Sequence, residues 1–302
     1  MSTDGDSPTT ETGLTRAHVR RPSIADLSNR LPVPIPPTVK NAYHRLALED
    51  EFDTYDHPPD PFAVRQVDPA RVESFTGRAY PPYHEKSAQL GTVRGGDWDR
   101  RAEAPITDPD YRERYDLYRA DGFTESTFFR SLQAHFDDGV DWEDTPFVAR
   151  CLTLAERGEP SWRSLTSSDA ILERCAKIDA LYEQIRSSGY HSQQALGEPS
   201  IQRVTDEVVV DIARDGQLLF VNGRHRLAIS KLLGLESIPV GVLVRHVEWM
   251  ETRDAYARDG PLTGADAPPC DHPDLCDLED SSRHSRWLPL PNTDSNGYIP
   301  FR

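Results

Sequence analysis

Lysine is nearly absent from this chain of 302 residues. Arginine supplies all but four of the 34 basic residues, and the four lysines are Lys40, Lys86, Lys177 and Lys231. Aspartate and glutamate number 50, which gives a net charge of −16. An acidic, lysine-poor surface suits a salt-rich cytoplasm, because carboxylates retain water where salt screens ordinary repulsion. We therefore expect a halophilic protein, and in such a cell net acidity argues only weakly against a nucleic-acid partner.

Long apolar runs and cysteines are also scarce. The clearest apolar run, residues 238–244, is far too short to span a bilayer, and residues 1–15 lack the apolar stretch of a secretory signal. Four cysteines are too few for a domain held together by disulfides. We expect a soluble, cytoplasmic protein with reduced thiols and no membrane partner.

Composition and periodicity divide the chain into four parts. Residues 1–38 form an acidic, proline-rich tail that we expect to be disordered, and residues 251–302 form an irregular tail rich in proline and aspartate. Residues 39–165 read as a mainly helical block, and residues 166–250 as a smaller domain of helices and strands. The expected fold class is α+β, with a small mixed sheet packed against the helical block.

The clearest local pattern lies in residues 166–250. Apolar residues at helical spacing predict a helix over 168–187, capped by Ser167 and stopped by Gly189. Alternating residues then predict a hairpin, strands 208–212 and 217–221 around an Asp-Gly turn. A short helix that ends at Gly234 and a buried strand over 238–244 complete the pattern.

The junction between the second hairpin strand and the short helix carries the strongest chemical signal. It reads Asn222, Gly223, Arg224, His225, Arg226. The first N–H groups of a helix and its positive dipole end favour an anion, and arginine guanidinium groups match phosphate oxygens. The alternative is structural: Arg224 and Arg226 pair with surface carboxylates while His225 caps the helix or fills a polar gap. The local chemistry leaves both interpretations open.

The wider arrangement resembles the ParB/sulfiredoxin superfamily over about residues 169–248. The shared features are a helix ending in glycine, a strand pair, a Gly-containing Arg-rich loop, a short helix and an Ile-Pro-Val strand. The resemblance implies nucleotide phosphate binding by the loop Asn222–Arg226. Arg224 stands where sulfiredoxin has its catalytic cysteine, so sulfiredoxin chemistry is not expected. The free-serine kinases of this superfamily carry Asp-Gly-His-His-Arg, which the loop matches at three of five positions, with Asn222 in place of the acid.

An enzyme of this type would be a nucleotide-dependent phosphotransferase or hydrolase. It would use a nucleoside triphosphate with Mg²⁺, and it would need a carboxylate to hold the metal or accept a proton. The candidate catalytic residues are His225, Asp179 and Glu183, with Asp211 as a further carboxylate. Asp179 and Glu183 are equally typical of the solvated face of a helix, and we favour that interpretation.

The alternative function is a DNA-associated or regulatory adaptor of ParB type without catalysis. We find no helix-turn-helix pattern after residue 244, which argues against a complete partition protein. The expected partner is therefore a nucleotide or another phosphorylated small molecule, and charge gives no support to nucleic acid.

Two further clusters have weaker patterns. Cys270, His272 and Cys276 could offer soft metal ligands, but their spacing differs from common zinc sites, so no metal site is expected. Gly95–Asp99 places two glycines beside two acids and Trp98, which suits either a ligand site or a tight turn with a buried indole, and we favour the turn.

Overall fold

The computed structural model describes residues 36–84, 86–107, 111–112, 115–197, 200–261 and 271–279. The terminal tails that we expected to be disordered lie mostly outside these residues. Residues 37 and 38 differ from the expectation, because helix α2 (Pro37–Phe52) begins there. Proline is well suited to the first turn of a helix, where its missing N–H would have no partner.

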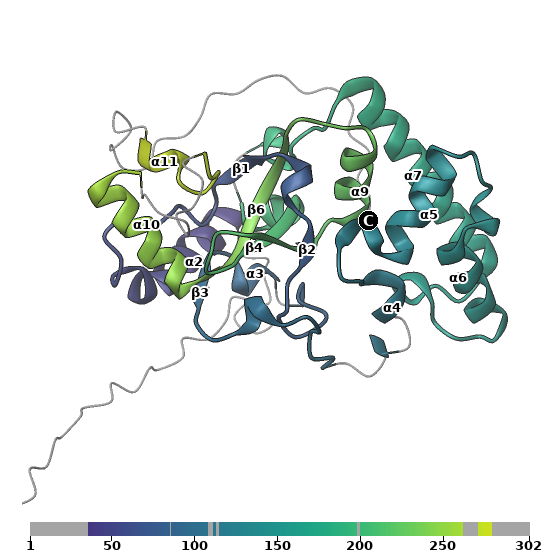
Figure 1. Ribbon diagram of the computed structural model, residues 1–302, viewed down its shortest axis with the longest axis horizontal. Coiled ribbons are helices and arrows are strands. Elements are labelled where there is room, and N and C mark those ends of the chain that lie inside the picture. The colour runs from purple at the N-terminus through teal and green to yellow at the C-terminus, as the bar shows by residue number, and fades with distance from the viewer. Residues whose placement is uncertain are drawn as a thin grey trace, which may run out of the picture.

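A mixed sheet of six strands lies at the centre of the molecule (Figure 1). The strand order is β1-β6-β4-β5-β2, and β3 pairs with β6 beyond this path. β4 is parallel to β6 and antiparallel to β5, while β1 is antiparallel to β6. The fold class is therefore α+β, as expected. The strands are β1 (Val64–Val67), β2 (Ser74–Phe75), β3 (Thr92–Arg94), β4 (Val208–Ile212), β5 (Leu218–Asn222) and β6 (Ile238–His246).

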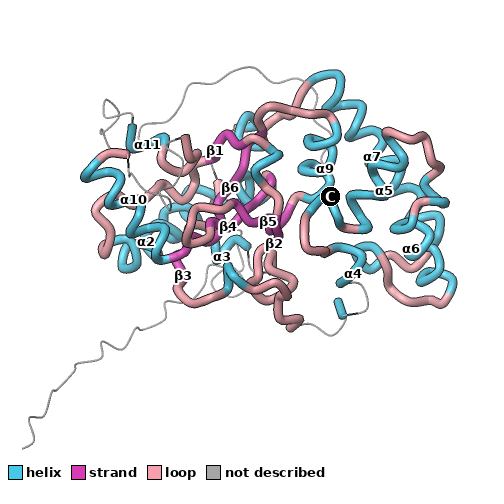
Figure 2. The backbone as a smooth tube through the Cα atoms, viewed as in Figure 1, coloured by secondary structure: helices cyan, strands magenta, loops and turns pink. Residues whose placement is uncertain are grey.

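The first half of the block 39–165, where the sequence is irregular and contains proline, also contributes strands. It supplies β1, β2 and β3, which join the same sheet as β4–β6 (Figure 2). These strands are short, and their partners are distant in sequence: Val64 lies opposite Gly241, and Ser74 opposite Leu219. Their conformation depends on those partners rather than on local propensity, so no local pattern indicated them.

Helices cover both ends of the sheet. On one side lie α2, α10 and α11, and on the other lies a group built from α4–α7, with α9 between that group and the sheet (Figure 1). The helix α7 has the predicted Ser167 cap and ends before Gly189, whose φ is +79°. The remaining helices are α3 (Lys86–Gln89), α4 (Tyr115–Tyr118), α5 (Thr127–Phe136), α6 (Pro146–Glu156), α7 (Ser168–Ser188), α8 (Ile201–Thr205), α9 (Arg224–Leu232), α10 (Val247–Asp259) and α11 (Cys276–Glu279).

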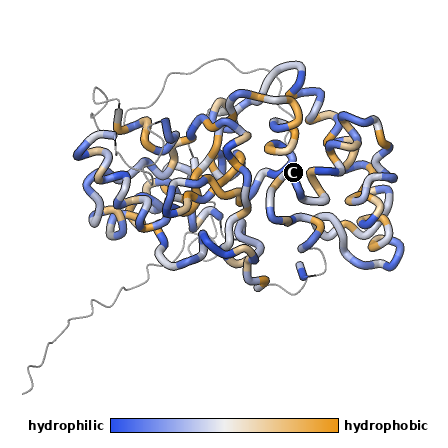
Figure 3. The backbone as a smooth tube through the Cα atoms, in the orientation of Figure 1, coloured by the Kyte–Doolittle hydropathy of each residue, from blue (hydrophilic) through white to orange (hydrophobic). Residues whose placement is uncertain are grey.

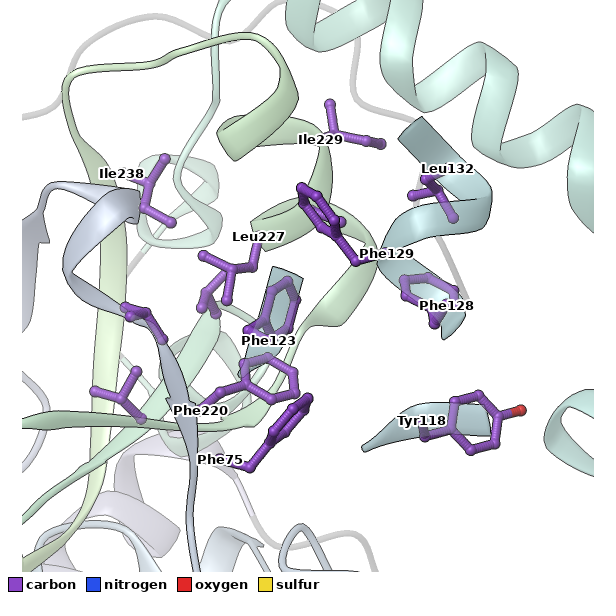
Figure 4. Packing of buried hydrophobic residues seen from close by; sticks show 14 of the residues in the cluster. Phe75, Tyr118, Phe123, Phe128, Phe129, Leu132, Phe220, Leu227, Ile229 and Ile238 are labelled. Atoms are coloured by element: carbon purple, nitrogen blue, oxygen red, sulfur yellow. The ribbon is translucent and has the colours of Figure 1, made fainter. Parts of the chain in front are cut away.

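An aromatic core joins the helical group to the sheet. The rings of Phe123 and Phe220 have centroids 4.9 Å apart, and Phe75 meets Phe220 edge-on at 5.7 Å. Leu227 of α9 and Phe129 of α5 belong to the same buried cluster (Figure 4). The hydrophobic stretches of the chain follow this core, along the central strands and α9 (Figure 3). Packing on both sides therefore fixes the position of α9.

The C-terminal region contains more regular structure than an irregular tail from residue 251 would have. Residues 251–259 continue α10, and residues 271–279 pack on the body and include α11. Asp274 is fully buried there, where its carboxylate binds Arg245 at 2.6 Å and the indole of Trp249 at 3.0 Å.

Candidate functional site

The loop at the start of α9 has the expected strand–glycine–helix geometry. β5 ends at Asn222, and Gly223 is the N-cap of α9 with a left-handed φ of +90°. A Cβ atom on Gly223 would lie 2.9 Å from the Cα of Val208 and 3.2 Å from the carbonyl oxygen of Glu207. Glycine is therefore required both by the backbone conformation and by the close approach of β4.

In the described part of the chain, the first turn of α9 lacks a side-chain cap, as does that of α6, whereas α5 and α7 are capped. Ser126 and Ser167 cap α5 and α7 by accepting a backbone N–H with their hydroxyl groups. Among the described residues, no side chain caps α9. Its first N–H groups and the positive end of its dipole are therefore available to an anion.

Arg224 extends over aromatic rings beside this helix start. The central carbon of its guanidinium lies 4.1 Å from the ring centre of Tyr118 and 5.5 Å from that of Phe128. These two rings stand at the edge of the aromatic core in Figure 4. In the part of the chain that the structure describes, Arg224 forms no ion pair with a carboxylate. The structural alternative, pairing with an acid, therefore does not apply to Arg224 within that part.

His225 lies inside the helical group. Its ring is buried, meets Phe128 edge-on at 5.1 Å and stacks on Trp162 at 5.7 Å with an interplanar angle of 21°. These contacts come from α5 and from the 3₁₀ turn Trp162–Ser164. They set the orientation of the imidazole by packing.

Arg226 turns the other way, toward the start of β4. It donates a hydrogen bond to the carbonyl of Asp206 and lies 3.8 Å from Oε2 of Glu207. Glu207 is completely buried and accepts hydrogen bonds from the Ser192 hydroxyl and the Gln193 N–H, both at 2.5 Å. Burial raises the pKa of Glu207, although these donors and Arg226 oppose the shift. The structural interpretation thus fits Arg226, with a buried acid as its partner rather than a surface one.

The candidate catalytic carboxylates have partners elsewhere. Asp179 accepts a hydrogen bond from the Trp142 indole at 2.9 Å and lies 3.2 Å from Nε2 of His135. Glu183 is exposed and pairs with Arg186 one turn along α7. Asp211 is buried in the sheet and pairs with Arg78 at 2.6 Å. The structure therefore brings Asn222–Arg226 together but gives Asp179, Glu183 and Asp211 contacts outside that loop.

The described residues form no metal site built from three or more protein ligands. Within the described ranges, no three side chains of His, Cys, Asp or Glu are arranged to bind a metal ion. Glu207, the acid that pairs with Arg226, already accepts hydrogen bonds from four donors, those of Tyr190, Ser192, Gln193 and Gln194. The Glu207 carboxylate is therefore already engaged by protein groups.

The two weaker sequence clusters have structural contacts. His272 is buried and bonds to the carbonyl of Gly216, Cys276 is exposed, and Cys270 lies outside the described residues. Trp98 is buried beside the left-handed Gly96, and Asp99 binds Arg214 at 2.8 Å. The turn interpretation of Gly95–Asp99 is therefore confirmed.

Sequence reasoning missed Arg119, which lies one residue after Tyr118. Its side chain is 8% exposed, and its Nη2 donates to the carbonyl of Thr76 at 2.9 Å. Its guanidinium also lies over the rings of Phe75 and Tyr115, at 5.0 and 5.4 Å. No motif surrounds Arg119 in the sequence, so only the fold reveals its aromatic surroundings.

A separate pocket of about 420 Å³ lies away from the loop. Its polar lining comes from Arg78, His84, Gln89, Arg94 and Thr107, and the remainder is mostly proline. Arg78 is already paired with Asp211 behind the pocket, and Gln89 accepts a hydrogen bond from Arg78.

Comparisons with known proteins add nothing to these observations. No family model, curated protein or solved structure matches the chain. Among the described residues, no helix has the length and apolar character needed to cross a bilayer.

Proposed function

We propose that this protein binds a nucleotide or another phosphorylated ligand at the start of α9. The observation that carries the proposal is the position of Arg224, a guanidinium without a carboxylate partner among the described residues, beside an uncapped helix N-terminus. Phosphate oxygens would accept hydrogen bonds from the first N–H groups of α9 and from Arg224.

The order of elements supports the proposed relationship to ParB/sulfiredoxin-like proteins. The hairpin β4–β5 leads through the loop into α9, and β6 then returns beside β4 in parallel. This arrangement puts the loop at the end of β5, with α9 packed on the same core as the sheet.

The three side chains after Gly223 have different roles in this proposal. Arg224 contacts the ligand. Arg226 holds the loop against β4 through Asp206 and Glu207, and His225 anchors the first turn of α9 among the rings of Phe128 and Trp162.

Binding without catalysis is favoured over phosphoryl transfer. Proton transfer from an attacking hydroxyl needs a carboxylate within reach of the phosphate. Asp179, Glu183 and Asp211 all have partners elsewhere, and Glu207 is held by Arg226 and by donors from residues 192–194. A regulatory or adaptor protein that senses a cytoplasmic nucleotide fits this arrangement better than a kinase.

The test is calorimetric binding of a ribonucleotide panel in chloride buffer, with and without Mg²⁺, while hydrolysis is followed in the same samples. Arg224→Gln should weaken binding by about tenfold or more, since a charge-assisted bond is lost. Arg258→Gln is the matched control, because Arg258 is an exposed arginine of α10 that pairs only with its neighbour Asp259 among the described residues. Equal affinity in all three proteins, or no binding at all, would refute the proposal. Hydrolysis of the nucleotide would show that the protein is an enzyme rather than a sensor.

A further inference from the structure

Two aspartates near the end of the described chain bind three arginines of the sheet and α10. Asp274 accepts hydrogen bonds from Nε and Nη2 of Arg245 at 2.9 and 2.6 Å, and Nε of Arg65 lies 3.4 Å from the same carboxylate. Asp277 accepts a hydrogen bond from Nη1 of Arg253 at 2.9 Å, and Nη2 of Arg65 lies 3.4 Å from this second carboxylate. The shared carboxylates therefore place the three guanidinium groups in one cluster, which we call the arginine surface.

The arginine surface is built from three separate elements. Arg65 lies on β1, Arg245 near the end of β6 and Arg253 on α10. The side chains of Arg245 and Arg253 are only 1% exposed. Three cations at one surface repel one another, so acidic groups are needed to stabilise them there. The two carboxylates that do so belong to the segment 271–279, whose helix α11 lies beside α10 (Figure 1).

An apolar anchor lies between the two aspartates in the sequence. Leu275 is fully buried, in the same core cluster as Trp249 and Tyr256 of α10. The indole of Trp249 also donates a hydrogen bond to Asp274 at 3.0 Å. The arginine surface and the adjoining core therefore match one leucine flanked by two carboxylates, in the pattern Asp-Leu-x-Asp.

The segment 271–279 is attached to the body largely through side chains. The backbone N–H groups of Leu275 and Leu278 bond to carbonyls of the segment itself, those of His272 and Leu275. Contacts with the body include the two carboxylates, the buried Leu275 and the imidazole of His272, which bonds to the carbonyl of Gly216 at 2.8 Å. A segment held in this way can open as a separate unit while the sheet keeps its hydrogen bonds.

We infer that the arginine surface is a docking site for acidic peptides of the pattern Asp-Leu-x-Asp, which residues 271–279 occupy in cis. Charge complementarity and the apolar anchor identify the partner as a protein that carries such a peptide, and its binding displaces the segment. This inference goes beyond the proposed phosphate site and does not depend on it. The tether to α10 gives the segment an effective concentration on the order of millimolar, so a free peptide competes poorly until the cis contact is weakened.

The test uses the full chain and a fluorescently labelled synthetic peptide with the sequence of residues 271–279. The double variant Asp274→Asn/Asp277→Asn removes both carboxylates from the cis segment and leaves the three arginines in place. This variant should bind the peptide at least about tenfold more tightly than the wild type, whose own segment competes. Fluorescence anisotropy measures the affinities, and circular dichroism verifies that each protein is folded.

Two controls isolate the role of the carboxylates. Glu173→Gln/Glu183→Gln removes two exposed acids of α7, which pair with Lys177 and Arg186, and this protein should bind the peptide as weakly as the wild type does. A second peptide has asparagine in place of both aspartates of the Asp-Leu-x-Asp pattern. The second peptide should bind the double aspartate variant at least about tenfold more weakly than the first, because charge-assisted hydrogen bonds are lost.

The inference is overturned if the folded variant Asp274→Asn/Asp277→Asn does not bind the first peptide, or binds both peptides equally. Dimers of the wild type in light scattering that are absent in this variant would identify a second copy as the occupant and would also overturn it. Should the variant fail to fold, hydrogen exchange in the wild type decides. The protection factor of the Leu275 amide should be at least about tenfold lower than that of Val244 in β6, and equal protection would contradict the inference.

Discussion

At the scale of single residues, Gly223 is the position on which the candidate site depends. Its φ of +90° is a conformation that L-residues rarely adopt, and the backbone of Val208 lies where a side chain would begin. The glycine therefore serves the fold and the site together. It turns the chain from β5 into α9, and it leaves the first N–H groups of the helix open.

Gly223→Ala should lower the free energy of unfolding by about 1–3 kcal/mol, because strain and a close contact act together. Gly234→Ala is a matched control: Gly234 has a φ of +60°, but no described atom would lie within 4 Å of a Cβ at this position. The control should cost about 1 kcal/mol. Urea denaturation measures both, and equal losses would show that contact with Val208 is unimportant.

At the scale of elements, the segment 271–279 binds to both the sheet and α10. Asp274 at its centre binds Arg245 and Trp249, and Arg65 lies 3.4 Å from the same carboxylate. His272 donates from Nε2 to the carbonyl of Gly216 at 2.8 Å and accepts the N–H of Asp274 at Nδ1. These two bonds require the neutral imidazole, so protonation of Nδ1 would break the contact with Asp274.

The segment 271–279 should make the free energy of unfolding depend on pH. Burial lowers the pKa of His272 from 6.5 to about 4, so the unfolded chain takes up a proton before the folded protein does. The free energy of unfolding should therefore be constant above about pH 6.5 and decrease as pH falls from 6.5 toward 4, by about 3 kcal/mol in total. His272→Gln should reduce this slope and leave the part that comes from His44, whose pKa burial also lowers, whereas His191→Gln, at an exposed position, should keep the full slope. Urea titrations between pH 4.5 and 7.5 measure the slope, and identical slopes in both variants would contradict this assignment.

At the scale of the whole molecule, the helical group α4–α7 and the sheet share one core. Phe123 lies between them, with Phe75 and Phe220 on the sheet side and Phe129 of α5 on the other. His225 and Trp162 extend the same contact toward α9. The two halves of the chain should therefore unfold together.

Phe123→Ala should lower the free energy of unfolding by about 3–5 kcal/mol while the transition stays single. Val39→Ala, at a site that is 54% exposed, should change it by less than about 0.5 kcal/mol. Calorimetry, far-ultraviolet circular dichroism and tryptophan fluorescence should give coincident transitions. Separate transitions for helical and sheet signals would show that the halves are independent.

The sequence by itself determined the elements that depend on neighbouring residues. The helix α7 with its Ser167 cap, the hairpin β4–β5 and the glycine at the start of α9 all follow from local periodicity, capping and turn chemistry. The turn that contains the buried Trp98 also follows from local sequence. In each case the partners of the backbone groups lie within a few residues, so the pattern can be read along the chain.

Only the tertiary structure decided which side chains meet. It formed β1, β2 and β3 by pairing short segments with distant strands, and it placed the ring of Tyr118 against the guanidinium of Arg224. It also gave Arg226 a buried partner in Glu207, and it directed Asp179 to Trp142 rather than to the loop. Contacts between residues far apart in sequence leave no periodic trace, because they depend on the packing of whole elements rather than on local backbone preference.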